Sequence, residues 1–306
     1  MAVERAVISR KLVIVLVLTA MFMVIEAVAG WVSGALALLA DAGHMLLDVA
    51  ALGLAAFTAW LAQKPATAEK TYGYLRLEIL AAMVNGAALI GIAAGVIYEA
   101  IDRLQEPHPI RVDIFLVTAI AGLFINLFSL RVLHGVRHGS LNVRGAYLHV
   151  VGDALGSVGA IIAALIVQFT GWLMADPILS IALSLLILGR AIQLLKESTN
   201  VLLEGTPPHV PMDDVRRRLL SVEGVNDVHD LHVWTVTSGV IAMSGHAVVP
   251  DLAHHPVALR QMLEELKTLG IQHTTMQLEV VDHCEGLDCL RQVAATNGHH
   301  GHGHSH

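Results

Sequence analysis

The chain has 306 residues, of which 55% are hydrophobic and 15% are charged, and its mean hydropathy is +0.64. This composition excludes an ordinary soluble domain and predicts several helices that cross a lipid bilayer. The formal net charge of −7 is a weak guide to partners, because the charge of the 18 histidines depends on pH and on bound metal. The sequence has no basic, aromatic-interleaved surface, so we expect a polytopic α-helical membrane protein that binds no nucleic acid.

Six apolar segments, each long enough to cross a bilayer, follow one another along the chain. They are residues 12–32, 36–61, 77–98, 114–133, 146–169 and 177–195. The first resembles a secretory signal, but its apolar run is too long and contains Glu26, so we predict a helix there. Basic residues gather before the first segment, after the second and between the fourth and fifth. By the positive-inside rule, both termini are expected in the cytoplasm.

A second domain is expected after the last apolar segment, where "EGTPPHVP" breaks the helical pattern. Its elements are predicted in the order αββαβ, at residues 212–222, 225–237, 240–249, 256–269 and 273–281. In the final strand, alternation places Met276, Leu278 and Val280 on one face and Thr275, Gln277 and Glu279 on the other. We therefore assign residues 1–205 to a membrane domain, 206–290 to an α+β domain and 291–306 to a disordered tail.

The end of the chain offers further metal donors. The low-complexity tail "NGHHGHGHSH" suggests accessory metal capture by histidines, unless it is an expression tag; they are His299, His300, His302, His304 and His306. Cys284 and Cys289, in "HCEGLDC", are too few for a disulfide framework. They could form a thiol metal site or be two reduced cysteines.

Two apolar segments carry the same pair of ionisable residues. His44 and Asp48 lie four residues apart in the second segment, as do His149 and Asp153 in the fifth. Residues four apart share one face of a helix. Each ionisable group near a bilayer centre costs at least about 2.5 to 3.5 kcal/mol, so four of them require a reason. The structural alternative is a separate His–Asp hydrogen bond within each helix.

If the two faces converge, they offer two nitrogen and two oxygen donors, a set that suits a tetrahedral dication such as zinc. Two carboxylates balance the charge of the ion, and protons should replace it when it leaves. This competition predicts metal/proton antiport. Two further polar residues are candidates for supporting roles around the ligands. Asp41 could orient His44 or lie at the membrane mouth, and Asn85 could line a water path or bond between helices.

Four motifs together resemble the cation diffusion facilitator family, in particular its bacterial zinc and cadmium exporters. They are "ADAGHMLLD", "TYGYLRLEILAAMVNG", "HVVGDALGSVGA" and "DLHVW", and the resemblance spans nearly the whole chain. It implies six-helix subunits with a cytoplasmic ferredoxin-like domain, which form homodimers through both domains in a bacterial inner membrane. It also implies zinc bound by His44, Asp48, His149 and Asp153, since members with histidine at the first of these positions prefer zinc and cadmium.

The resemblance implies a second zinc site in the cytoplasmic domain. Its matching positions are His229, His246, Glu279 and one of His254 and His255, with His232, His283 and Cys284 as alternatives. Gln277 stands where some members have a histidine ligand. A further loop site of some members is expected to be missing, because "QKPATAEKTYGY" offers only Glu69.

The expected function is export of zinc, with cadmium, cobalt and nickel as further candidates, in exchange for protons. A membrane-embedded metalloenzyme and a metal sensor are the alternatives. An enzyme is not expected, because the sequence has no HExxH motif and no serine or cysteine beside the four ligands.

Overall fold

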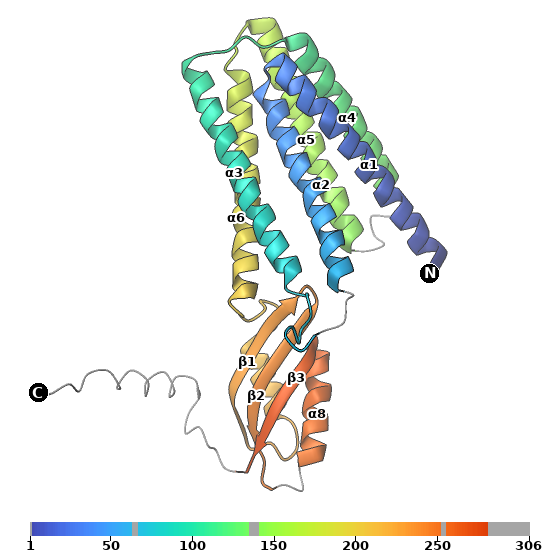
Figure 1. Ribbon diagram of the computed structural model, residues 1–306, viewed down its shortest axis with the longest axis vertical. Helices are drawn as coiled ribbons and strands as arrows, with labels where there is room; N and C mark the ends of the chain where they lie inside the picture. Colours follow the sequence, from blue (N-terminus) through green and yellow to red (C-terminus); the bar gives the residue numbers. More distant parts are fainter. Residues whose placement is uncertain (1, 63–66, 135–140, 252–254, 281–306) are drawn as a thin grey trace, which may run out of the picture. The chain divides into compact units, whose positions relative to one another are not determined.

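The computed structural model describes residues 2–62, 67–134, 141–251 and 255–280. The chain divides into two compact units, one made of long helices and one built around a small sheet (Figure 1). The short segment that precedes α3 groups with the sheet unit, together with the residues that follow position 196.

Six long helices make up the first unit. They are α1 (Ala2–Ser33), α2 (Leu36–Ala62), α3 (Leu77–Gln105), α4 (Val112–His134), α5 (Leu141–Thr170) and α6 (Ala175–Leu202). Among the described residues, α1, α3, α4, α5 and α6 each contain a stretch long and apolar enough to cross a membrane. The chain is therefore a multi-pass membrane protein. Helices α3 and α6 extend beyond the predicted apolar segments. The additional residues are polar but still helical, and a prediction from hydropathy alone does not include them.

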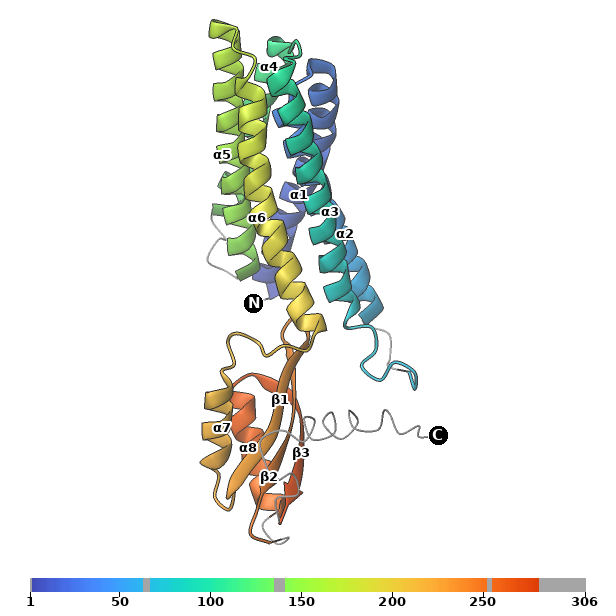
Figure 2. The same ribbon diagram turned by 90° about the vertical axis from the view of Figure 1, so that its left-hand side faces the viewer.

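Small side chains bring the long helices close together. Helices α1, α2, α4 and α5 pack around a buried cluster that is rich in alanine and includes Phe115 and Leu38. Such residues let helix backbones approach closely where no hydrophobic effect drives them together. Helix α3 runs beside α6 in both views (Figures 1 and 2). A Cβ atom added at Gly86 of α3 would lie 3.5 Å from the Ala191 carbonyl oxygen, so this glycine admits the α6 backbone.

The buried Asp176 and the partly buried Arg103 join the helix ends at the connection between α1 and α2. Gly34 makes this connection with φ of +73°, a conformation that suits glycine. The Asp176 carboxylate, at the start of α6, accepts hydrogen bonds from the amides of Leu36 (2.7 Å) and Ala37 (3.0 Å). Arg103 of α3 donates to the Gly34 carbonyl oxygen. The start of α2 is thus capped by a residue from another helix.

Replacing Asp176 by alanine should lower the melting temperature of the purified protein in detergent, followed by circular dichroism. The change leaves two buried N–H groups without an acceptor, which typically costs about 1 to 3 kcal/mol. The matched control is D113A, which removes an exposed carboxylate from the first turn of α4 and should have a smaller effect. Equal melting temperatures for D176A and D113A would contradict the capping role.

The second unit has the predicted order of elements. They are α7 (Met212–Leu220), β1 (Asp227–Thr237), β2 (Val240–Val248), α8 (His255–Thr268) and β3 (Ile271–Glu279). Strand β1 pairs antiparallel with β2 through the two-residue turn Ser238–Gly239, and β2 pairs parallel with β3. A parallel pair needs a crossover connection, and here α8 lies between β2 and β3 in the chain. The helices and strands enclose a core that includes Val215, Met243 and Met262.

Gln277 and Glu279 share one face of the last strand, as predicted, since the Gln277 side-chain amide donates to the Glu279 carboxylate at 2.7 Å. Glu279 is buried, with 4% of its surface exposed, whereas Val280 is 46% exposed. Strand β3 stops at Glu279, so alternation no longer controls Val280. The buried carboxylate lies against His229 and His246, and these contacts explain why an acidic side chain is kept from solvent.

Candidate metal centre

Helices α2 and α5 bring three of the four predicted ligands together. Their contact places His44 and Asp48 of α2 opposite His149 of α5. Asp48 Oδ2 lies 3.4 Å from His44 Nε2 and 3.1 Å from His149 Nε2. One ligand atom from each of these residues lies within 4.8 Å of the other two. We call these three residues the α2–α5 cluster.

The distances suit a shared ion. Tetrahedral zinc with bonds of about 2.0 to 2.1 Å separates its ligand atoms by roughly 3.3 Å. Within the described part of the chain, the buried atoms His44 Nδ1 and Asp48 Oδ2 have no hydrogen-bond partner of acceptable geometry. Buried polar atoms are normally satisfied, so this arrangement fits donors that converge on a cation better than a closed hydrogen-bond network.

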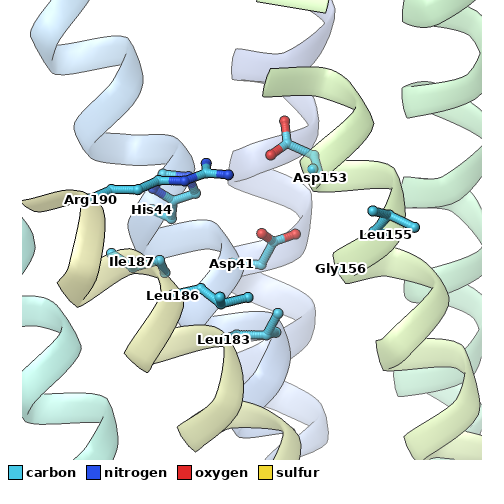
Figure 3. Close-up of a pocket in the computed structure, with 10 residues that line it drawn as sticks. Asp41, His44, Asp153, Leu155, Gly156, Leu183, Leu186, Ile187 and Arg190 are labelled. Carbon is cyan, nitrogen blue, oxygen red and sulfur yellow. The ribbon is translucent and has the colours of Figure 1, made fainter. Parts of the chain in front are cut away.

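Asp153 is next to the cluster but outside its group of three. Its Oδ2 atom lies 3.6 Å from His149 Nε2, one helical turn along α5. Asp153 also lines a cavity of about 260 Å³, together with His44 and Asp41 (Figure 3). The fourth predicted ligand therefore borders both the cluster and the cavity.

Residues of α6 form another wall of this cavity. They are Leu183, Leu186, Ile187 and Arg190. Figure 3 shows Arg190 reaching from α6 past His44 toward Asp153. Sequence reasoning missed this arginine, although a single basic residue within the apolar run "LSLLILGRAIQLL" was a visible signal.

The other polar residues of the helices have different surroundings. Asn126 of α4 donates to the Ser157 hydroxyl at 3.2 Å, and that hydroxyl donates to the Asp153 carbonyl oxygen at 3.1 Å. These bonds join α4 to α5, as expected for polar contacts between helices. Glu26 of α1 is 3% exposed, and Asn85 of α3 does not line the cavity.

A second group of donors lies on the sheet of the C-terminal unit. His229 of β1 is paired with His246 of β2, and Glu279 ends β3 on the far side of β2. The Glu279 carboxylate lies 3.5 Å from His229 Nε2 and 3.1 Å from His246 Nδ1. His229 and Glu279 side chains are each 2% exposed. We call His229, His246 and Glu279 the sheet cluster; its distances also suit a shared tetrahedral ion.

A β-bulge borders the sheet cluster. The register shifts between His229 and His232, where Asp230 adopts φ of +50°. Gly245 lies in the facing strand, and a Cβ atom there would come within 2.6 Å of Leu231. The bulge turns Asp230 so that its Oδ1 atom lies 3.0 Å from His232 Nε2. Asp230 was not predicted, because sequence alternation does not locate a bulge.

The remaining predicted donors that the structure describes, His232 and His255, do not join this group. His255 begins α8, where its Nε2 atom has no hydrogen-bond partner within the described residues, and His232 pairs with Asp230. His254, His283, Cys284 and the tail histidines lie outside the residues that the structure describes.

Two family models match consecutive parts of the chain. The cation efflux transmembrane domain matches residues 12–203, and the cytoplasmic domain of cation efflux proteins matches residues 207–281. Together they cover almost the whole sequence, and the first alone covers more than half of it.

Relatives of known description match over nearly their full length. The cadmium, cobalt and zinc/H(+)-K(+) antiporter of Bacillus subtilis is 42% identical over 301 residues, 96% of this chain and 97% of the relative. The zinc transporter ZitB of Escherichia coli is 45% identical over 298 residues, 96% of this chain and 95% of the relative. The metal cation efflux system protein CzcD of Cupriavidus metallidurans is 42% identical over 94% of this chain and 92% of the relative. These matches confirm the resemblance seen in the motifs, and the chain belongs to the cation diffusion facilitator family.

Proposed function

We propose that this protein exports zinc from the cytoplasm in exchange for protons, with cadmium, cobalt and nickel as further candidate substrates. The observation that carries the proposal is the α2–α5 cluster, whose imidazole nitrogens and carboxylate oxygen are spaced as ligands of one dication. The relatives named as zinc transporters and antiporters support the same substrate and the same exchange.

His44, Asp48 and His149 would hold the ion, with Asp153 as the fourth ligand. Two neutral imidazoles and two carboxylates form a locally neutral complex with a dication, which limits the cost of placing charge away from water. His149 contacts both carboxylates, so it joins the α2 and α5 parts of the site. Asp41 would act from the cavity without binding the metal directly.

Proton exchange follows from the chemistry of the same donors. Imidazole and carboxylate groups bind metal only when they are deprotonated, so metal and protons compete for them. After the ion leaves, neighbouring carboxylates repel each other in a poorly solvated site, and protons relieve that repulsion. A site that faces each side of the membrane in turn would therefore couple zinc export to proton entry.

The surrounding architecture is part of the proposal. Six crossings, with α2 as the second, would place both termini in the cytoplasm of a bacterium, with the protein in its inner membrane. Residues 1–205 would form the membrane domain and 206–290 a ferredoxin-like cytoplasmic domain, with a metal-capturing tail at 291–306. A homodimer would form through both domains; the match to the family's cytoplasmic domain supports this.

The sheet cluster would be a second zinc site, in the cytoplasmic domain. The short distances from Glu279 to both histidines and the burial of His229 and Glu279 support this proposal. A metal sensor with this site alone would leave the α2–α5 cluster without a role, and nothing in the described residues favours an enzyme. Transport therefore accounts for the α2–α5 cluster, which a sensor does not.

Replacing Asp48 or Asp153 by alanine should abolish coupled transport in proteoliposomes. Wild-type protein should move zinc inward while protons move outward, recorded with an internal zinc dye and a pH dye. Each variant should reduce both signals by more than about 100-fold, since loss of outer-shell partners alone costs 10-fold to 100-fold at metal sites.

The control for these variants is D102A, which removes an exposed carboxylate from α3 and should leave both signals unchanged. Normal zinc uptake by D48A and D153A would refute the site. Zinc uptake without opposite proton movement in the wild type would refute the exchange.

Replacing His246 by alanine should remove zinc bound by the sheet cluster. The full-length D48A protein is the background, so that the α2–α5 cluster contributes little, and bound zinc is measured after equilibrium dialysis. H246A in this background should lose zinc, whereas H273A, which changes an exposed histidine of β3 outside the cluster, should not. Equal zinc content in the two proteins would exclude this second site.

A further inference from the structure

An arginine lies within a helix that is apolar enough to cross the membrane. Arg190 belongs to α6, and its immediate neighbours in the chain are mostly leucine, isoleucine, alanine and glycine. A charged side chain in such a segment is costly, and such residues usually face a polar interior and a charged partner. The surroundings of Arg190 should therefore indicate its role.

The guanidinium lies beside the α5 part of the metal site. Arg190 lines the same cavity as Asp41, His44 and Asp153, and Figure 3 shows its end directed toward Asp153. A Cβ atom added at Gly152 would lie 3.7 Å from Arg190 Nη2, so the guanidinium packs against α5 one residue before Asp153.

The charges around the cavity do not balance without this arginine. Asp48 and Asp153 supply the two negative charges that a dication neutralises. A third carboxylate, that of Asp41, lines the same cavity. Arg190 supplies one positive charge on the same cavity.

We propose that Arg190 is the fixed counter-charge of this cavity, which sets how tightly the α2–α5 cluster holds zinc and how readily it releases the ion. The inference rests on the proposed function. Arg190 binds no metal in this view, so it is a positioning residue that acts through charge. A nearby positive charge repels a bound dication, and solvent at the exposed Arg190 reduces this repulsion without removing it.

The direction of the effect follows from that repulsion. Removing the arginine charge leaves an excess negative charge beside the ion, so zinc should bind more tightly and leave more slowly. Removing the third negative charge, at Asp41, should weaken zinc binding instead. The two changes together restore the original balance.

The test compares variants of the full-length protein in proteoliposomes at one fixed alkaline pH, where proton competition is weakest. R190Q should lower the zinc KM by about tenfold or more and lower kcat as well. R190K keeps the charge and should restore both constants toward the wild type. D41N should raise KM, and the R190Q/D41N double variant should return it toward the wild-type value.

K196Q is the matched control, since it removes one positive charge from an exposed position on α6 that does not line the cavity. It should leave both constants unchanged. An unchanged KM in R190Q, or an R190K variant that behaves as R190Q does, would overturn the inference. If R190Q fails to fold, D41N still decides: a KM that does not rise refutes control by net charge. Failure of the wild type to transport zinc would instead refute the proposed function.

Discussion

The approach of α2 to α5 is the constraint on which the proposed metal site depends. It holds two imidazoles and a carboxylate within ligand distance of one another, in a region where unpaired charge is costly. Neighbouring features serve the same arrangement. Small residues let the helices approach one another. A hydrogen bond between Asn126 and Ser157 joins α4 to α5. A cavity lined by Asp153 borders the site.

The two donor clusters reach similar spacing by different means. On α2 and α5, the four-residue helical repeat stacks His over Asp on each helix, and helix packing brings the two stacks together. On the sheet, cross-strand pairing joins His229 to His246, and the end of β3 adds Glu279. The first arrangement depends on the contact between two helices, whereas the second is fixed within one hydrogen-bonded sheet. Movement of helices can therefore alter the first without disturbing the second.

Much of this arrangement could be predicted from local sequence, because helices and hairpins leave periodic signals. The apolar runs marked the long helices, and the repeated His–Asp spacing marked their ligand faces. Features that depend on distant partners were missed. The bulge at Asp230 depends on the facing strand, Asp176 caps a helix that lies 140 positions earlier in the chain, and the burial of Glu279 depends on two histidines. Arg190 gave a local signal, but its position beside Asp153 depends on how α6 packs against α5.

The cap on α2 has a mechanical consequence. Asp176 accepts hydrogen bonds from the first two amides of α2, whereas His44 and Asp48 lie further along the same helix. At a rise of about 1.5 Å per residue, they stand roughly 12 and 18 Å from Leu36. If α2 rotates about this anchored end, Asp48 moves about one and a half times as far as His44 does. A small rotation at the anchored end would thus move the Asp48 carboxylate away from His149 of α5 further than it moves the His44 imidazole, and the site would open from one side.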